Sequence, residues 1–361
     1  MISLFKPYMP SLPLMLPILE SGVLSYGKYT QEFENQLREY FSTPYVITTN
    51  SFSSAISVVV ASLGLKFGDE IIASPMGCLV STQSYLTCGL KVKWCDVDPN
   101  RGTLSPEVLR RTITSHTKVI VHNHYCGYPG YIDEINAIAR KYGIAVIDDG
   151  IECFGSRYKG KLIGNCGTDV TVFSLGAVRI PNCIDGGIVI FKDEELYKKS
   201  LLIRDCGIDR SRFRDELGEI NLECDIKLVG YSATMSNVNG YIGLEQMKKV
   251  NDLLNAQREN AEKWKFFFSE QSSYIPIYCD GCEPNYWVYG ILTDKKRETI
   301  MKFREMGYYA SGVHINNSIY SVFDGVNDCL PGAAEFNQRF VALPCGWWMS
   351  QNIGDMENGE E

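Results

Sequence analysis

Acidic side chains follow one of the apolar runs of the sequence at the point where a strand would end. Asp149 comes directly after the apolar run 144–148, and Glu152 follows shortly after it. Open α/β sheets bind ligands outside the carboxyl ends of their strands, so Asp149 is a candidate for ligand chemistry. The alternative is an aspartate that caps a helix. Glu152 would bring a second carboxylate into the same pocket.

An arginine and a serine lie in the segment 171–187, which contains the next apolar runs. The guanidinium of Arg179 stays protonated in proteins, so it can act neither as a general base nor as an amine that forms a Schiff base. Its planar fork can pair with Glu152 or Asp149, or bind a phosphate or carboxylate of a ligand. Ser174 offers a hydroxyl that the backbone can satisfy.

Short apolar runs alternate with amphipathic segments over the first two-thirds of the chain. The expected strands are 45–49, 70–74, 92–95, 118–122 and 144–148, and the expected helices are 54–65 and 132–142. Such alternation predicts an α/β fold with a mostly parallel sheet between helices. The runs 170–174 and 187–191 predict an adjacent pair of strands.

The pattern changes in the last third of the chain. A long amphipathic stretch over 241–268 predicts one helix, followed by a strand over 286–292 and a helix over 297–306. We therefore predict a large domain over residues 1–240, with an N-terminal arm, and a smaller C-terminal α/β domain over residues 241–361.

Composition excludes some classes of function. The 361 residues carry a net charge of −8, which speaks against binding to nucleic acid or to a membrane surface. We find no apolar run of transmembrane length and no signal-peptide pattern, so we expect a cytoplasmic protein. The thirteen cysteines are scattered. We expect the close pair Cys279 and Cys282 to be reduced thiols in a turn, and we expect no metal site.

Landmarks in a fixed order resemble the DegT/StrS-type sugar aminotransferases. The landmarks are 22–27, Phe33-Glu34, 63–72, Asp96-Val-Asp98, 124–127, 146–149, 204–207 and 230–236. The ordered match runs over roughly residues 1–345. The resemblance implies fold type I of the pyridoxal-phosphate (PLP) enzymes, a homodimer, and nucleotide-linked keto-sugars as substrates.

The resemblance also implies roles for single positions. It places Asp149 at the pyridine nitrogen of PLP, Ser174 at the phosphate, and Arg179 at the position of the Schiff-base lysine. Glu152 stands where the family has glutamine or histidine. His314 and Tyr286, with the nearby aromatics Trp287 and Tyr289, match positions that line the sugar pocket.

Other cofactor positions depart from the family pattern. Ser51, Phe52 and Ser53 stand at the phosphate loop, where Phe52 replaces a glycine that permits close approach of the backbone. Cys78 stands near the aromatic that stacks on the pyridine ring. Ser232 stands at an asparagine that the family supplies across the dimer.

These departures, taken together, lead to a functional prediction. The protein resembles enzymes of nucleotide-sugar, polysaccharide or natural-product biosynthesis, and we expect it to act on or bind a nucleotide-linked keto-sugar without a conventional lysine Schiff base. The resemblance implies PLP or its amine form PMP as cofactor. One alternative is a PMP-dependent sugar dehydratase-like enzyme with His122 or His124 as the base. The other is a non-catalytic nucleotide-sugar-binding protein, or a partner subunit of a catalytic relative.

Overall fold

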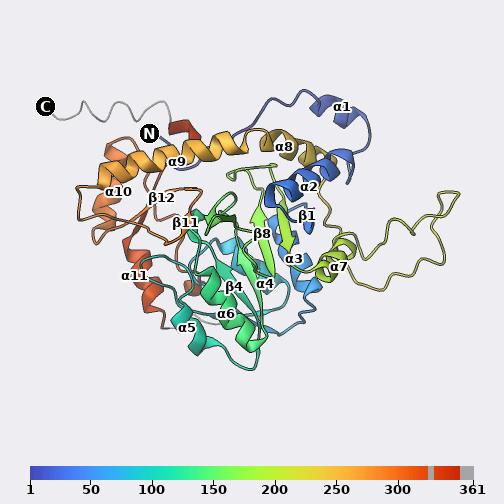
Figure 1. The fold of residues 1–361 in the computed structure, drawn as a ribbon, viewed down its shortest axis with the longest axis horizontal. Coiled ribbons are helices and arrows are strands. Elements are labelled where there is room, and N and C mark those ends of the chain that lie inside the picture. Colours follow the sequence, from blue (N-terminus) through green and yellow to red (C-terminus); the bar gives the residue numbers. More distant parts are fainter. Residues whose placement is uncertain (324–328, 350–361) are drawn as a thin grey trace.

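A large sheet forms the centre of the computed structural model, which describes residues 1–323 and 329–349 (Figure 1). Within these residues the sheet has the strand order β1-β9-β8-β5-β4-β2-β3. The strands are β1 Val46–Thr49, β2 Glu70–Ala73, β3 Lys91–Trp94, β4 Thr117–Asn123, β5 Ala145–Asp149, β8 Val170–Ser174 and β9 Gly187–Phe191. From β3 to β8 the neighbours are parallel, whereas β9 is antiparallel to both β8 and β1. The predicted mostly parallel sheet and the adjacent pair of strands are confirmed.

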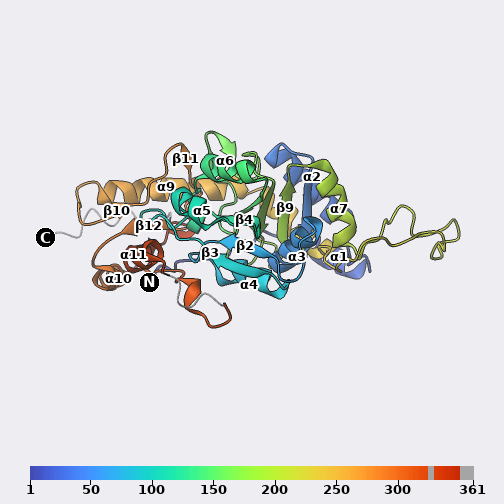
Figure 2. The same cartoon turned by 90° about the horizontal axis from the view of Figure 1, so that it is seen from below.

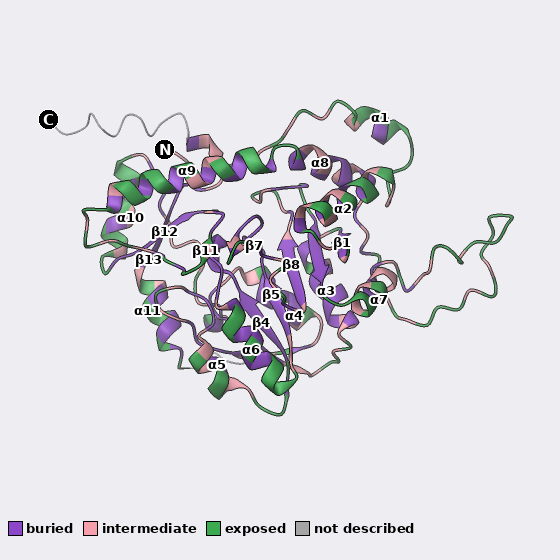
Figure 3. Cartoon of the chain, viewed as in Figure 1, coloured by how far each residue is buried: buried purple, intermediate pink, exposed green. Residues whose placement is uncertain are grey.

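Helices cover both faces of this sheet. Consecutive strand residues point to opposite sides, so apolar residues of one strand can pack against helices on both faces. Ile71 and Ile147 pack with α3 in one apolar cluster, whereas their neighbours Ile72 and Val146 pack with α6 in another. Figure 2 shows α3 and α4 on one side of the sheet and α5 and α6 on the other. The helices of this part are α1 Met15–Glu20, α2 Lys28–Phe41, α3 Phe52–Ser62, α4 Leu79–Thr87, α5 Pro106–Thr112, α6 Ile132–Tyr142, α7 Glu194–Arg204 and α8 Asn237–Met247. Figure 3 shows the strands buried and the outer helix faces exposed.

The last third of the chain forms a second, smaller core. A small antiparallel sheet contains β10 Ile275–Pro276, β12 Tyr289–Leu292 and β13 Phe340–Leu343. Trp264 and Phe268 of α9 (Val250–Phe268) pack against Tyr289 and Phe303 in this core. The other helices are α10 Lys296–Glu305 and α11 Pro331–Arg339, with single turns at η2 Asn317–Ile319 and η3 Trp347–Met349. The domain division after residue 240 stays a prediction; that residue lies within α8.

Two local predictions for this part are wrong. The single helix expected over 241–268 is divided into α8 and α9, because Lys249 has a φ of −116°, away from α-helical values. The strand expected from residue 286 begins at Tyr289. Tyr286 has a φ of 54°, in the left-handed region, which interrupts an extended backbone.

The expectation of reduced thiols at Cys279 and Cys282 is also wrong. The structure joins these residues in a disulfide, because the turn brings their Cα atoms to 5.4 Å, within the range that a disulfide needs. The bridge lies where β11 (Cys282–Glu283) adds to a small sheet with β6 (Arg157–Tyr158) and β7 (Lys161–Leu162).

A long segment between α7 and α8 projects from the body of the protein (Figure 1). Leu217, Leu222 and Val229 on this segment are 86%, 100% and 94% exposed. We call residues 207–232 the projecting arm. No helix in the described residues is both long and apolar enough to cross a membrane.

Candidate active site

Asp149 is the last residue of β5 and lies at the carboxyl end of the parallel strands. Strand alternation turns its side chain to the same side as Ile147, the side covered by α3 and α4. The residue is 6% exposed, and its Oδ1 accepts the backbone N–H of Ile151 at 3.2 Å. Burial raises the pKa of Asp149, and the charge of Glu152 adds to the rise. A buried carboxyl with a raised pKa at a strand end marks a candidate site.

Glu152 is held by three different groups in the turn that follows β5. Its Oε1 lies 2.7 Å from His314 Nε2 and 3.5 Å from Arg179 Nη1, and its Oε2 accepts the backbone N–H of Cys126 at 3.0 Å. Burial alone would raise the pKa of Glu152, but His314, Arg179 and the N–H of Cys126 hold it below its usual value. Glu152 is therefore an ionised carboxylate that links three segments of the chain.

Arg179 is fixed by a carboxylate and an aromatic ring. Besides the contact with Glu152, its guanidinium carbon lies 4.5 Å from the centre of the Trp287 ring, and its side chain is 10% exposed. The indole N–H of Trp287 donates to the carbonyl of Val178 at 3.0 Å, and Phe5 of the N-terminal arm stacks on the same indole at 4.3 Å. Nη1 of Arg179 is buried and has no hydrogen-bond partner among the described residues. Nη1 therefore interacts with Glu152 through charge and not through a hydrogen bond.

The space around Arg179 is nearly filled. A cavity of about 10 Å³ lies between Glu152, Ser174, Arg179, Asn285 and Trp287, which is room for about one water molecule. Ser174 lines this cavity, and its Oγ accepts the N–H of Gly176 at 3.1 Å. Asn285, which the sequence analysis missed, donates its amide to the carbonyl of Glu152 at 2.8 Å. In the sequence, Asn285 directly precedes the aromatic run 286–289, and this position could have marked it as a candidate site residue.

Two predicted site residues begin helices on the Asp149 side of the sheet. Cys78 directly precedes α4. Burial raises the pKa of its thiol, and the charge of Glu152 adds a smaller increase. Ser51 precedes α3 and accepts the N–H of Ser54 at 3.0 Å, so its hydroxyl caps the helix. Cys78 therefore lies within electrostatic reach of the Glu152 cluster, and Ser51 already has a structural partner.

The neighbours of Ser51 are also engaged within the protein. Phe52 is 4% exposed and packs in the main apolar cluster, and the hydroxyl of Ser84 donates to Ser53 Oγ at 3.0 Å. Ser232 lies apart from them, in a cavity of about 910 Å³ that Tyr26, Arg204 and Asp205 also line. None of the described residues that line this larger cavity lines the cavity at Arg179.

The side chain of His124 lies on the opposite side of the sheet from that of Asp149. Its Nδ1 accepts the backbone N–H of Gly130 at 3.0 Å, so a neutral ring carries its proton on Nε2, which lies 3.4 Å from Asp148 Oδ1. His122 Nδ1 lies 3.0 Å from the same oxygen. Burial alone would raise the pKa of Asp148, but the two imidazoles hold it well below its usual range, and burial lowers the pKa of His122. Both ring nitrogens of His124 thus face groups of the protein.

The predicted sugar-pocket residues have different positions. His314 joins the cluster through Glu152, and it lies 6.4 Å from Trp287, ring centre to ring centre. Tyr286 instead stacks edge-on against Tyr128 at 5.7 Å. The neighbouring Trp287, rather than Tyr286, is thus the aromatic that contacts Arg179.

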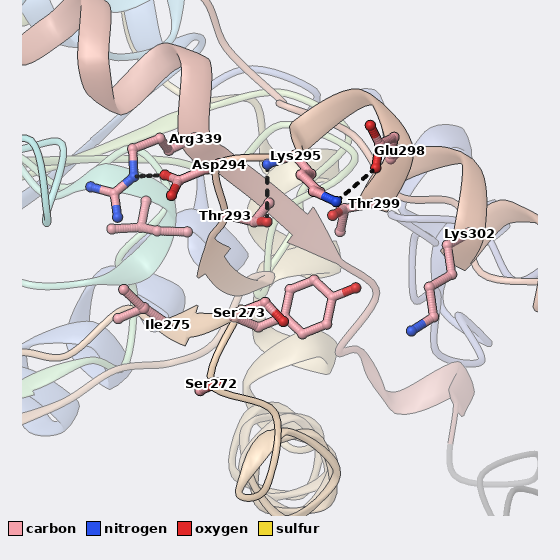
Figure 4. Close-up of a pocket in the computed structure, with 12 residues that line it drawn as sticks. Ser272, Ser273, Ile275, Thr293, Asp294, Lys295, Glu298, Thr299, Lys302 and Arg339 are labelled. Carbon is pink, nitrogen blue, oxygen red and sulfur yellow. Dashed lines mark hydrogen bonds and ion pairs between the residues drawn. The ribbon is translucent and has the colours of Figure 1, made fainter.

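A separate groove lies on the smaller sheet (Figure 4). It has a volume of about 490 Å³ and is lined by Thr293, Lys302 and the neighbouring charged residues. Arg339 pairs with Asp294 at 3.2 Å and Lys295 with Glu298 at 3.7 Å, so most charges of the groove neutralise one another. These residues are not part of the Arg179 cluster.

The mostly parallel central sheet between helices matches the structures of PLP-dependent aminotransferases. The chain belongs to the DegT/DnrJ/EryC1/StrS aminotransferase family, whose sequence model matches residues 12–354. It is 25% identical to the spore coat polysaccharide biosynthesis protein SpsC of Bacillus subtilis, over 94% of this chain and 92% of that protein. It is 30% identical to the uncharacterised protein MJ1066 of Methanocaldococcus jannaschii, in a match that spans 69% of this chain and 64% of that protein.

Solved structures show the same fold. The sugar aminotransferase CalS13 from Micromonospora echinospora superposes with a TM-score of 0.90 at 26% identity, over 98% of this chain and 97% of that chain. A putative sugar aminotransferase from Streptococcus pneumoniae, Spr1654, has been determined in a PLP form. It has a TM-score of 0.86 at 20% identity over 97% of this chain and 95% of that chain, and at this identity the likeness concerns the fold alone.

Proposed function

We propose that this protein binds a nucleotide-linked keto-sugar in the biosynthesis of a polysaccharide or natural product, and that it does not transaminate through a lysine Schiff base. The observation that carries the proposal is the buried ion pair of Arg179 with Glu152, 3.5 Å apart, beside the Trp287 ring. By the resemblance, Arg179 stands at the position of the cofactor lysine. A guanidinium that stays charged cannot supply the neutral amine that a Schiff base needs.

The residues present do not fit a lysine-linked PLP. Asp149 suits a protonated pyridine nitrogen, because it is a buried carboxyl at the end of a parallel strand. The resemblance places Ser51 and Phe52 at the phosphate of such a ligand. In the structure, Ser51 already caps α3 and Phe52 occupies the start of that helix. PLP or PMP, where it binds, would be held without a covalent bond, and we derive no reaction step through it.

A homodimer is part of the proposal. Three apolar side chains of the projecting arm are almost fully exposed in the single chain: Leu217 at 86%, Leu222 at 100% and Val229 at 94%. Apolar surface of this kind is stabilised when a partner covers it. Ser232 is the last residue of the arm and lines the large cavity away from Arg179, which agrees with a residue that serves the partner subunit.

The dehydratase-like alternative receives less support. It requires a histidine that can accept a proton from a ligand. His124 has Nδ1 occupied by Gly130 and Nε2 directed at Asp148, and His122 is fully buried against the same carboxylate. The partner-subunit alternative remains open to test, because exposed apolar residues on the arm suit a catalytic relative as well as a second copy.

Thermal unfolding with a panel of nucleotide-linked sugars tests the proposal. A ligand at 100 times its Kd adds about 2.7 kcal/mol to the stability of the folded state and raises Tm. We expect a nucleotide-sugar, but not its free nucleotide or free sugar at the same concentration, to give the full shift. Arg179→Met should reduce the shift, whereas the distant control Arg339→Met should not. Equal shifts with the free nucleotide, or none with any nucleotide-sugar in the presence or absence of PMP, would remove the proposal.

A further inference from the structure

The disulfide between Cys279 and Cys282 has two unlike sulfur environments. Cys279 is 6% exposed, and its Sγ accepts an N–H from Arg101 Nη2 at 3.1 Å. Cys282 is partly exposed and lies in a turn whose other residues, Asp280 and Gly281, are exposed. An attacking group can therefore reach the sulfur of Cys282 more easily than that of Cys279.

Arg101 is fixed where it can stabilise a negative charge on Cys279. The same Nη2 also donates to the carbonyl of Pro129 at 2.8 Å, and the guanidinium carbon lies 4.0 Å from the centre of the Tyr131 ring. Other charged groups around the bridge are more exposed: Asp280 in the turn, and Lys159, whose amine pairs with Asp133. A guanidinium in contact with a sulfur favours its thiolate form.

We propose that Cys279 and Cys282 are a reversible thiol–disulfide site that exchanges with low-molecular-weight thiols. Cys282 is the point of attack and Cys279 is the leaving group. This inference does not depend on the proposed function, because it concerns residues outside the Arg179 cluster.

The exchange proceeds in two balanced steps. A thiolate attacks Sγ of Cys282, the S–S bond breaks, and its electron pair goes to Sγ of Cys279 beside Arg101. The product is a mixed disulfide on Cys282. A second thiolate attacks the outer sulfur of this mixed disulfide and releases Cys282 as a thiolate. The protein gains two electrons and two protons, and two thiols become one disulfide.

The bridge lies on the segment that continues into the candidate active site. Cys282 begins β11, and Asn285 follows it, with its amide donating to the carbonyls of Glu152 at 2.8 Å and Phe154 at 2.9 Å. Trp287, which contacts Arg179, lies two residues after Asn285. The redox state of the pair therefore sets a covalent constraint close to residues that hold Glu152 and Arg179.

Redox titration of the full-length protein tests the proposal. The native protein would be equilibrated in buffers of reduced and oxidised glutathione, quenched with acid, alkylated, and analysed by peptide mass spectrometry. We expect the pair to pass between disulfide and dithiol in one two-electron transition without denaturant. A pair that stays reduced in the most oxidising buffer, or that excess dithiol reduces only after unfolding, would overturn the proposal.

Trapping of the mixed disulfide tests the direction of attack. Samples quenched early in the reduction of the wild-type pair by glutathione should carry glutathione on Cys282 and the alkylating agent on Cys279, because attack at Cys282 places the mixed disulfide there. Arg101→Met should slow reduction of the wild-type pair, and Arg101→Lys, which keeps the charge, should recover part of the rate. Glutathione trapped mainly on Cys279, or reduction of Arg101→Met at the wild-type rate, would contradict the assignment of Cys279 as leaving group.

Discussion

The guanidinium of Arg179 lies 3.5 Å from the carboxylate of Glu152, and the two side chains are 10% and 2% exposed. Two charges held this far from water depend on each other, because either one alone would be buried without a counter-charge. His314 and the N–H of Cys126 complete the environment of Glu152. The pair therefore both organises the pocket and keeps a permanent cation in it.

We expect Glu152→Gln to destabilise the protein by about 3 kcal/mol, since it leaves Arg179 buried without its counter-charge. The double variant Glu152→Gln/Arg179→Met should cost less than the sum of the two single variants, because the residues are in contact. Urea unfolding of the four proteins measures this coupling. Additive costs would show that the pair contributes no mutual stabilisation.

The two carboxyls of the site should respond to pH in opposite directions. The folded-state pKa of Asp149 is raised, so its contribution is present below the unfolded pKa, about 3.9, and is lost as pH rises through the folded value. Asp149→Asn should therefore gain stability relative to wild type between about pH 4 and neutrality. Unfolding free energies at several pH values measure this trend, and a loss of relative stability over that range would contradict it.

Glu152 provides the matched control for this trend. Its folded-state pKa is lowered, so its contribution is present above the unfolded pKa, about 4.3, and is lost as pH falls through the folded value. The stability difference between wild type and Glu152→Gln should therefore shrink on acidification below about pH 4. A difference that does not change with pH would mean that Glu152 is not held ionised.

Ser51→Ala should cost about 1 kcal/mol, because the hydroxyl accepts the N–H of Ser54 at the start of α3. Ser57→Ala, on the same helix, is the control and should change stability by less than about 0.5 kcal/mol. Chemical denaturation separates the two. Nucleotide-sugar binding should be the same in both variants; selective loss of binding in Ser51→Ala would make this hydroxyl a ligand contact instead.

The projecting arm should carry the subunit contact. Leu222→Glu combined with Val229→Glu should convert a dimer to monomers in sedimentation velocity, since it places charges on apolar side chains that a partner would cover. Phe67→Glu, at a residue that is 91% exposed elsewhere on the protein, should leave the dimer intact. A dimer that survives the arm substitutions would locate the interface on another surface.

Much of this architecture was predictable from periodicity. The short apolar runs of β2, β4 and β5 alternate with amphipathic helices, and the carboxyl end of β5 pointed to Asp149. Periodicity did not separate α8 from α9, because the break lies in a backbone angle of Lys249 and not in the spacing of apolar residues. The aromatics at 286–289 were indicated by the family resemblance and not by periodicity, and neither signal showed that the Trp287 ring is the one that contacts Arg179.

Contacts that depend on the conformation of a turn or loop could not be predicted in this way. The disulfide depends on a turn that brings Cys279 and Cys282 together, and the hydrogen bond of Gly130 to His124 depends on a loop beyond β4. The sequence does place Arg179 and Glu152 as possible partners. Their ion pair emerges because β5 and β8 are neighbours, which brings the segments after both strands together.

Borohydride trapping with PLP tests most directly whether the Arg179 pocket excludes a lysine-linked cofactor. The full-length protein and the Arg179→Lys variant would be incubated with PLP, reduced, and mapped by peptide mass spectrometry. We expect no stoichiometric adduct in the pocket of the wild type, and little in Arg179→Lys, because Ser51 and Phe52 are already engaged within the protein. A stoichiometric adduct on one lysine of the wild type, protected by a nucleotide-sugar, would contradict the proposed function.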